Sequence, residues 1–299
     1  MMTRNAGTRF INKEKIKDKD MMITKNYIAK GEGANRFEKI PVQIYETADE
    51  AVKAVAREIV DLVQTKAASS EKCVLGLATG VSPIKLYQEL VRLHREEGVS
   101  FRNVVTFNLD EYLPMPKESE QSYHYFMHHH LFDHIDIDPK NIHIPDGTLE
   151  GDEIDKFCRD YEKAIDAAGG IDLQILGIGR TGHIGFNEPG SFITSQTRKV
   201  FLNDLTIKDA IKDFGSRNLV PTKAITMGVG TIMQARRVIL MAWGEKKAPI
   251  IKATVEGRVS DSVPATFLQM HSNVQFIIDE SAASELTRAD YPWLVSKGD

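Results

Sequence analysis

The chain has 299 residues, of which 42% are hydrophobic and 27% are charged, and its formal net charge is -4 with a pI near 6.2. This length allows one large α/β domain or two smaller ones, each with a sizeable buried core. The acidic balance and the lack of a dense Lys/Arg tract in the body of the chain argue against nucleic acid as a partner, so we expect a small substrate.

The two cysteines, Cys73 and Cys158, belong to no CxxC pair, and nothing indicates a disulfide framework. Such cysteine usage is typical of the reducing cytoplasm. The sequence has no apolar run long enough to cross a bilayer and no secretory signal pattern after Met1. We therefore expect a soluble cytoplasmic protein with no membrane partner. The oligomeric state is not readable from the sequence, and a homo-oligomer is compatible with it.

Residues 1–40 differ in character from the rest of the chain. They mix basic and acidic residues, as in the run from Lys13 to Asp20, without a sustained apolar period. This composition favours a mobile extension over a strap that packs on a neighbour. Residues 41–299 alternate short apolar runs with amphipathic segments and contain no internal repeat. This pattern predicts a single α/β domain in which helices flank a mostly parallel sheet.

The expected elements of this domain follow in chain order. Thr47 and Glu50 form a capping box, and apolar residues at helical spacing continue to Val63, which predicts a helix. Short apolar runs predict strands at 73–77, 104–107, 173–176, 238–242 and 274–278. Amphipathic segments predict further helices at 83–94, 247–256 and 280–286.

The loop at 78–83 turns the first of these strands into a helix. Ser82 is a good N-cap and Pro83 suits the first helical position, so free backbone amides should face the edge of the sheet. Such a terminus favours anions, particularly phosphate, but the loop lacks the spacing and the lysine of a P-loop. The alternative is an ordinary capped helix without a ligand.

Two adjacent carboxylates, Asp110 and Glu111, follow the strand at 104–107. Burial in a cleft would raise the pKa of one of them and make it a usable proton acceptor. Because adjacent side chains of an extended segment point to opposite sides, only one of the pair should face the cleft. The alternative is a loop in which Asp110 caps a helix.

The stretch at 123–130 is rich in histidine. His124 and His128 stand four residues apart, a spacing that could offer two metal ligands on one helical face. No HExxH motif or cysteine companion appears, and the interleaved aromatic residues suit a packed helix. We therefore expect surface or packing histidines and no metal site.

A glycine-rich loop at 177–189 follows the strand at 173–176 and contains His183 and Glu188. In open α/β sheets, ligands bind at the carboxyl ends of strands, which favours a catalytic role for these two groups. The glycines also satisfy GxGxxG, but Pro189 stands where the helix of a dinucleotide site should be under way. A plain glycine-rich turn with an incidental histidine is the other alternative.

Lysines and arginines gather in two further places. Lys208, Lys212 and Arg217 lie along the segment 200–218, and Lys247 follows the strand at 238–242. Each group by itself is typical of a solvated surface. Beside the loop at 78–83, however, such cations would suit a sugar phosphate.

Four segments together resemble the glucosamine-6-phosphate deaminase family, also called isomerase. They are VVTFNLDEY at 104–112, GIGRTGHIGFNEPGS at 177–191, MGVGTIMQA at 227–235 and GEKKA at 244–248. The likeness runs from about residue 41 to about residue 286, with the segments in the right order and at similar spacing. It implies a modified Rossmann-like α/β fold. It also implies conversion of glucosamine 6-phosphate and water into fructose 6-phosphate and ammonia, without an organic cofactor.

The resemblance also implies roles for single residues. Asp110 matches the base that moves a proton between C2 and C1 of the opened sugar. His183 matches the group that exchanges a proton with the ring oxygen, and Glu188 matches its carboxylate partner. The remaining matches belong to the phosphate cradle, and they are Thr79, Gly80, Val81, Ser82 and Lys247. The chemistry agrees, since a carboxylate suits the proton shift and an imidazole, which titrates near neutral pH, suits ring opening.

Two positions near the implied site depart from the family pattern. Thr181 stands where the best-known members carry Asp and others carry Asn, so only a hydroxyl is left to orient His183. We expect this change to affect the rate or the pH optimum more than the type of reaction. Lys212 replaces the lid arginine, which keeps the charge but loses the bidentate fork. Arg217 is a candidate to compensate.

A third departure concerns regulation. Ser191 and Arg198 match the family's allosteric site for N-acetylglucosamine 6-phosphate, but Val200 replaces a lysine of that site. We expect weak activation by this metabolite or none. Two other functions stay open: the same chemistry on another amino-sugar phosphate, such as galactosamine 6-phosphate, and a sugar-phosphate sensor that has lost turnover.

Overall fold

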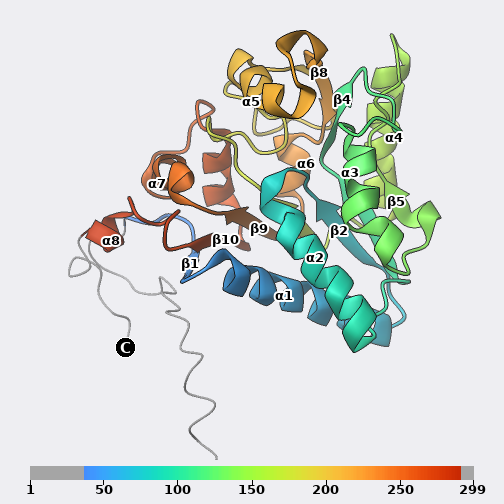
Figure 1. Cartoon of the computed structure of the whole chain (residues 1–299), viewed down its shortest axis with the longest axis horizontal. Helices are drawn as coiled ribbons and strands as arrows, with labels where there is room; N and C mark the ends of the chain where they lie inside the picture. The colour runs from blue at the N-terminus through green and yellow to red at the C-terminus, as the bar shows by residue number, and fades with distance from the viewer. Residues whose placement is uncertain (1–36, 291–299) are drawn as a thin grey trace, which may run out of the picture.

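The computed structural model describes residues 37–290, which form a seven-stranded sheet, a smaller sheet and the helices around them (Figure 1). The strand order of the large sheet is β1-β10-β9-β6-β2-β3-β5, and every neighbouring pair is parallel. Its strands are β1 (Val42–Tyr45), β2 (Cys73–Leu77), β3 (Val104–Asn108), β5 (Ile142–His143), β6 (Leu173–Leu176), β9 (Arg237–Ala242) and β10 (Val274–Asp279). The predicted α/β class with a mostly parallel sheet is confirmed.

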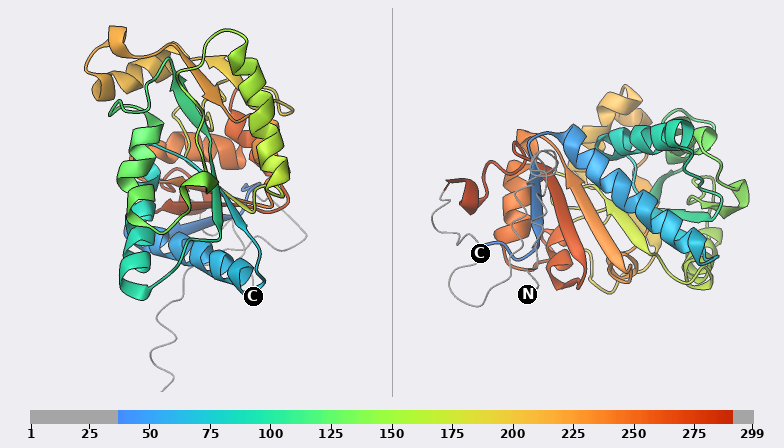
Figure 2. Two further views of the ribbon diagram at one scale, coloured as in Figure 1. Left: turned by 90° about the vertical axis from the view of Figure 1, so that its right-hand side faces the viewer. Right: turned by 90° about the horizontal axis from the view of Figure 1, so that it is seen from below.

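Helices cover both faces of this sheet. One face carries α1 (Ala48–Ala68), α2 (Val81–Glu97) and α3 (Tyr123–His130). The other carries α4 (Glu153–Ala167), α6 (Val229–Met233), α7 (Ala248–Glu256) and the 3-10 helix η5 (Pro264–Met270). The right-hand view of Figure 2 shows α1 crossing in front of the strands. The shorter elements are η1 (Phe132–His134), η2 (Pro139–Asn141), η3 (Arg217–Leu219), η4 (Glu245–Lys247) and α8 (Thr287–Asp290).

The central strands are apolar on both sides. In β9, Val238 and Leu240 pack in the core beneath α7, whereas Ile239 and Met241 pack in the core beneath α1. A strand that is covered on both faces reads as a continuous apolar run and not as an alternating pattern. This explains why short apolar runs located these strands in the sequence.

A three-stranded antiparallel sheet with the order β4-β8-β7 stands at the carboxyl edge of the large sheet. It consists of β4 (Asp110–Leu113), β7 (Arg198–Phe201) and β8 (Lys223–Thr226), and α5 (Asp204–Phe214) packs against it. These elements lie together at the top of Figure 1. Leu109 joins the two sheets, because its N–H donates to Leu77 O at 3.0 Å and its carbonyl accepts from the N–H of Met227 at 2.6 Å.

Several predicted boundaries are confirmed. β2 and β6 have the predicted bounds, and the side chain of Thr47 caps α1 by accepting a hydrogen bond from the N–H of Glu50 at 3.3 Å. The predicted aromatic and histidine-rich helix is α3, in which Met127 is buried and Tyr125 is 39% exposed.

The predicted start of the helix after β2 is wrong. Ser82 is not its N-cap, because α2 begins at Val81 and the residue before it is Gly80, which has a φ of 92° and no side-chain cap. Residues with a side chain rarely adopt such a φ, so the glycine turns the chain into the helix earlier than expected. Pro83 then lies within the first helical turn, where backbone N–H groups have no partner within the helix, so the N–H that proline lacks is not needed.

The helix predicted at 280–286 is also wrong, since this segment forms consecutive turns and α8 begins only at Thr287. The carboxylate of Asp279 accepts hydrogen bonds from the N–H groups of both Ala282 and Gly244. Because Ala282 and Leu286 are fully buried, the segment is held against the core in a form that the amphipathic pattern did not reveal.

The prediction of a mobile extension at 1–40 lies mostly outside the described residues. Where the described chain begins, Glu38 forms an ion pair with Arg288 at 2.8 Å, and the N–H of Lys39 donates to Val255 O at 2.8 Å. Ile40 is 2% exposed. Residues 38–40 thus pack on the domain. None of the helices in residues 37–290 is long and apolar enough to cross a membrane.

Gly228 permits the close packing of α6 on the segment at 195–196. A Cβ added there would lie 2.0 Å from the carbonyl oxygen of Ser195, a backbone atom that cannot rotate away. We expect Gly228→Ala to lower the free energy of unfolding by about 3 kcal/mol. Gly177→Ala is the matched control, because its Cβ would meet nothing closer than 4.0 Å. Urea unfolding of both variants checks the prediction, and equal stability would contradict it.

Candidate active site

The carboxyl ends of four adjacent strands bring the predicted site segments to one edge of the large sheet. In the order β9-β6-β2-β3, these ends lead into η4 with Lys247, the loop at 177–189, the loop at 78–80 and β4 with Asp110. The order of the strands thus assembles groups that are far apart in the sequence, as open α/β folds do for their ligands.

Asp110 is buried, with 5% of its surface exposed, at the start of β4. It pairs with Thr226 of β8, and the turn at Gly185 covers it so closely that a Cβ on this glycine would lie 3.2 Å from Asp110 Oδ2 and 2.9 Å from Thr226 Oγ1. Burial, with a smaller contribution from the charge of Glu111, raises the pKa of Asp110 to about 8. A carboxyl group of this kind is a proton acceptor poised near neutral pH.

The side chain of Glu111, next to Asp110, bonds to the backbone. Its carboxylate accepts three backbone hydrogen bonds, from Tyr112 at 2.9 Å and from Tyr123 and His124 at 3.0 Å each. Burial raises its pKa to about 7 in spite of these bonds. The two carboxylates thus have different partners, since Asp110 faces the Gly185 turn and Glu111 bonds to the start of α3. The alternative in which Asp110 caps a helix is wrong, because Asp110 begins the strand β4.

The imidazole of His183 lies between the backbone of Gly179 and the side-chain oxygens of Thr181 and Glu188. Its Nδ1 is 2.8 Å from Thr181 Oγ1 and 3.3 Å from Glu188 Oε2. A Cβ on Gly179 would lie 2.0 Å from the imidazole ring, so this glycine leaves the space that the ring fills. Thr181 therefore occupies the orienting position that the sequence assigned to it, with a hydroxyl in place of an acid.

Glu188 is held on both carboxylate oxygens. Oε2 faces His183 and accepts a long bond of 3.4 Å from Thr181, and Oε1 accepts a hydrogen bond from the hydroxyl of Thr206 on α5. Burial by itself raises the pKa of Glu188, but the hydrogen bond and charge of His183 and the bonds from Thr206 and Asn203 outweigh it, so the pKa lies below its ordinary value. The group is thus a carboxylate at neutral pH and can stabilise a protonated imidazole.

The loop at 78–80 and the first turn of α2, together called the phosphate ledge below, lie beside the glycine-rich loop at 177–189. Ser82 lies 4.0 Å from the position that a Cβ on Gly177 would take, and its carbonyl accepts a hydrogen bond from Trp243 Nε1 at 3.0 Å. Thr79 hydrogen-bonds to the hydroxyl of Tyr123. Val81 is 74% exposed. The ledge therefore presents a helix N-terminus toward the same edge as Asp110.

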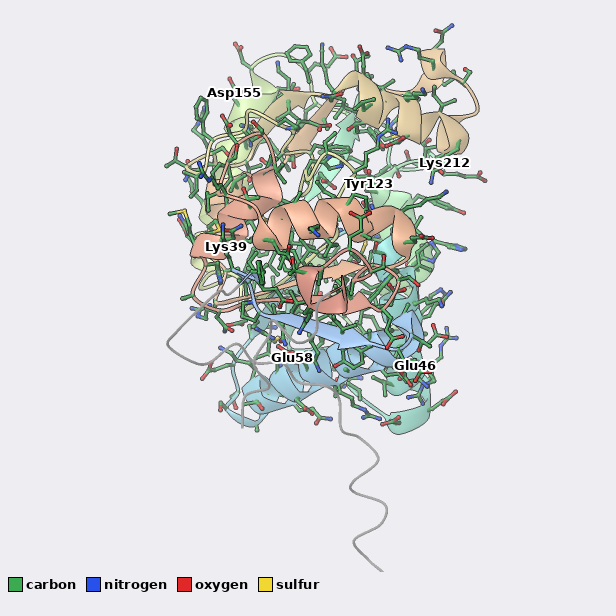
Figure 3. All side chains as sticks on the ribbon, turned by 90° about the vertical axis from the view of Figure 1, so that its left-hand side faces the viewer. Lys39, Glu46, Glu58, Tyr123, Asp155 and Lys212 are labelled. Atoms are coloured by element: carbon green, nitrogen blue, oxygen red, sulfur yellow. The ribbon has the colours of Figure 1, made fainter. Side chains whose placement is uncertain are left out.

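Two lysines lie near the glycine-rich loop and influence each other. Lys247 donates from Nζ to the carbonyl of Ile178 at 2.6 Å, and burial lowers its pKa, as does the nearby charge of Lys212, whereas Asp209 acts in the opposite direction. Lys212 extends from the last turn of α5 and is labelled in Figure 3 together with Tyr123 of α3. Arg217 instead forms an exposed ion pair with Asp204 at 2.7 Å.

The two residues of the predicted allosteric site lie beside each other. Arg198 donates to Ser191 Oγ at 3.2 Å and to Asn187 Oδ1 at 2.9 Å, and burial lowers its pKa. Asn187 in turn donates to the carbonyls of Ile184 and Met227 at 2.8 Å each. The guanidinium is thus engaged within the protein, next to the turn that contains His183 and Glu188.

The geometry bears on two further predictions from the sequence. The segment at 177–197 contains no helix, so the glycines do not build a dinucleotide site. The rings of His124 and His128 stack with centroids 4.5 Å apart, and His128 Nδ1 contacts Asp133 Oδ1 at 2.7 Å. Within residues 37–290, no group of three or more His, Cys, Asp and Glu residues could hold a metal ion.

Sequence reasoning missed the contribution of α5 to this edge. Thr206 contacts Glu188, and Asp209 forms an ion pair with Arg180 of the glycine-rich loop at 3.1 Å. The local sequence pattern does not indicate a role for either residue. Thr206 is a common polar residue near a helix start, and Asp209 is typical of a solvent-exposed helix face. Only the packing of α5 over the edge reveals them.

The fold thus gathers a buried carboxyl, an imidazole–carboxylate pair and a helix N-terminus at one edge of an open α/β sheet, an arrangement typical of enzymes. A family model described as glucosamine-6-phosphate isomerases/6-phosphogluconolactonase matches residues 46–277, and the chain belongs to this family.

Relatives and solved structures agree with the assignment. The chain is 50% identical over 223 residues to a glucosamine-6-phosphate deaminase of Shewanella woodyi, an alignment that covers 75% of this chain and 84% of the relative. It is 48% identical over 261 residues to a glucosamine-6-phosphate deaminase-like protein of Bacteroides thetaiotaomicron, which covers 87% of this chain but only 39% of that longer relative.

Among solved structures, a glucosamine-6-phosphate deaminase described as monomeric aligns with a TM-score of 0.78 and 41% identity over 82% of this chain and 99% of its own. The 6-phosphogluconolactonase of Trypanosoma brucei shares the fold, with a TM-score of 0.66 at 22% identity over 82% of this chain and 98% of its own.

The buried charge of Asp110 should make the folded state less stable as the pH rises. In the unfolded chain this group titrates near its ordinary value of 3.8, whereas in the folded chain it titrates near 8, so ionisation between these values favours unfolding. We expect Asp110→Asn, which cannot ionise, to unfold at a higher temperature than the parent chain. The difference should grow from about pH 4 to about pH 8 and then level off. Thermal unfolding at several pH values checks this, and a difference that shrinks with pH would contradict it.

Proposed function

We propose that this chain converts glucosamine 6-phosphate and water into fructose 6-phosphate and ammonia. The observation that carries the proposal is the convergence of a buried carboxyl, Asp110, with the His183–Glu188 pair around one turn of the chain. Identities of 41 to 50% to proteins named as glucosamine-6-phosphate deaminases support the same reaction. The lactonases of the family are more distant, at about 20% identity, and support the fold alone.

The first step is opening of the sugar ring. His183 takes a proton from the C1 hydroxyl and then gives one to the ring oxygen, which yields the open-chain aldehyde. Glu188, held as a carboxylate, stabilises the imidazolium that forms between these transfers. Thr181 lies at hydrogen-bonding distance from His183 Nδ1 and bridges it to Glu188.

The second step is the shift of a proton between two carbons. Asp110 removes the proton from C2 and returns it to C1, while a proton of the amine nitrogen passes to the C1 oxygen. The aldehyde thus becomes the C1 alcohol and the amine carbon becomes an imine. Water adds to this imine and ammonia leaves, which gives the ketose. The group must be ionised to accept the proton, and its raised pKa makes it a stronger base once it is ionised.

The phosphate group would hold the open chain in register during both steps. The backbone of Thr79, Gly80, Val81 and Ser82 at the start of α2 favours an anion, and Lys247 and Lys212 supply positive charge beside it. Binding energy from this remote group then supports the proton transfers at the other end of the sugar.

A sugar phosphate is kept inside cells by its charge, which supports a cytoplasmic location for the enzyme. The solved deaminase that is 41% identical to this chain is described as monomeric, whereas the sequence is also compatible with a homo-oligomer. The mass of the purified chain in solution decides between these states.

Release of ammonia tests the reaction and its base together. Purified protein should release ammonia from glucosamine 6-phosphate, and Asp110→Asn should lower kcat by about a thousandfold because the proton acceptor is lost. The rates of ammonia release from glucosamine 6-phosphate and galactosamine 6-phosphate at equal concentration show which epimer is preferred. An assay with 6-phosphogluconolactone tests for the other activity of the family. Full activity of Asp110→Asn would contradict the assigned base.

The substitution at Thr181 and the lysine at position 212 favour a second candidate, a sugar-phosphate sensor with little turnover. In that case glucosamine 6-phosphate would raise the unfolding temperature of the wild-type chain, as any ligand of the folded state does, without release of ammonia.

The hydroxyl of Thr181 should be required for full activity. Thr181→Val removes a hydrogen bond to the His183–Glu188 pair, and loss of a bond to charged groups costs about 1.5–3 kcal/mol, so kcat should fall about tenfold to a hundredfold. Thr181→Ser retains the hydroxyl and is the matched control. Steady-state kinetics check the prediction, and an unchanged kcat in the valine variant would show that the hydroxyl does not orient the histidine.

A further inference from the structure

Helix α5 contacts the glycine-rich loop at two points that have no role in the mechanism above. At its start, the Thr206 hydroxyl donates to Glu188 Oε1, and the backbone of Asn203 also bonds to this carboxylate. One turn further on, Asp209 pairs with Arg180 at 3.1 Å. The helix is therefore fixed to the loop that carries His183.

Lys212 lies in the last turn of the same helix, and its charge acts on Lys247, whose amine is bonded to the carbonyl of Ile178. The start of the helix contacts Glu188.

Thr206 stands at the point where this helix meets the acid–base pair. Its side chain is buried, with 8% exposed, and it bonds to the oxygen of Glu188 that does not face His183. A carboxylate that is held on one oxygen only can rotate about its last bond, whereas a carboxylate held on both oxygens keeps its direction. The hydroxyl therefore decides whether Oε2 stays aimed at His183 Nδ1.

We propose that Thr206 is a positioning residue, whose hydroxyl holds Glu188 Oε1 so that Oε2 stays directed at His183 Nδ1 during ring opening. The inference rests on the proposed deaminase function. Without this hydrogen bond, the carboxylate would stabilise the imidazolium less well and ring opening would be slower.

Three variants test the direct role of the hydroxyl. Thr206→Val should lower kcat for glucosamine 6-phosphate by about tenfold to a hundredfold and change KM by less than about threefold. Thr206→Ser should keep kcat within about threefold of the wild type. Thr254→Val is the control, since it removes another buried threonine hydroxyl from a helix, one that bonds to Ile250 O, and it should leave kcat unchanged.

Binding of the reduced open-chain analogue, 2-amino-2-deoxyglucitol 6-phosphate, separates positioning from a loss of structure. This analogue needs no ring opening but still engages the phosphate ledge. Its dissociation constant should be the same for the wild type and Thr206→Val. Weaker binding by more than about fivefold would mean that α5 and Lys212 have moved, which would overturn the proposal. If valine destabilises the fold, Thr206→Ala removes the same hydroxyl with a good helix former and repeats both measurements.

A double-mutant cycle tests whether Thr206 acts through Glu188. Glu188→Gln alone should lower kcat, and adding Thr206→Val should lower kcat by less than about threefold more, because the hydroxyl acts on this carboxylate. If the two separate reductions in kcat multiply in the double variant, Thr206 acts by another path and the proposal is wrong. If the wild-type chain releases no ammonia, the proposed function fails; if it does and Thr206→Val is fully active, only this inference fails.

Discussion

The structure depends on the two backbone hydrogen bonds of Leu109. Its N–H belongs to the large sheet through Leu77, and its carbonyl belongs to the small sheet through Met227. A single residue thus sets the register of one sheet against the other. Because Asp110 follows immediately, its position relative to the loops after β2 and β6 is determined by backbone geometry and not by its own side-chain contacts. Burial then makes the group a base, and the Gly185 turn closes over it.

The sequence predicted the fold well because parallel strands carry a strong signal. A run such as 73–77 is apolar throughout since both of its faces are buried, and its bounds were located without ambiguity. The pair Asp110–Glu111 illustrates a second reliable signal. Strand geometry alone implied that the two carboxylates serve different sides, and in the structure Glu111 bonds to the start of α3 while Asp110 faces Gly185 and Thr226.

Except for the start of α2, which depends on the local φ of Gly80, the failures originate in contacts between distant segments. Ser82 had the properties of an N-cap, but the positive φ of Gly80 moved the start of α2 to Val81. The turns at 280–286 are held by Asp279, which also bonds to Gly244 of another loop. Thr206 gave no signal, because its importance comes only from the carboxylate above it. Local sequence patterns predict single helices and strands, whereas the candidate site is formed by contacts between them.

The engagement of Arg198 has a consequence for any anion that approaches this face. Its guanidinium already donates to Asn187 and Ser191, and Asn187 in turn supports the carbonyls of Ile184 and Met227 on either side of the catalytic turn. An incoming phosphate would have to exchange these partners for its own oxygens, so its net gain is only the difference between two sets of hydrogen bonds. This competition for one side chain therefore limits how strongly an anion can bind at this face.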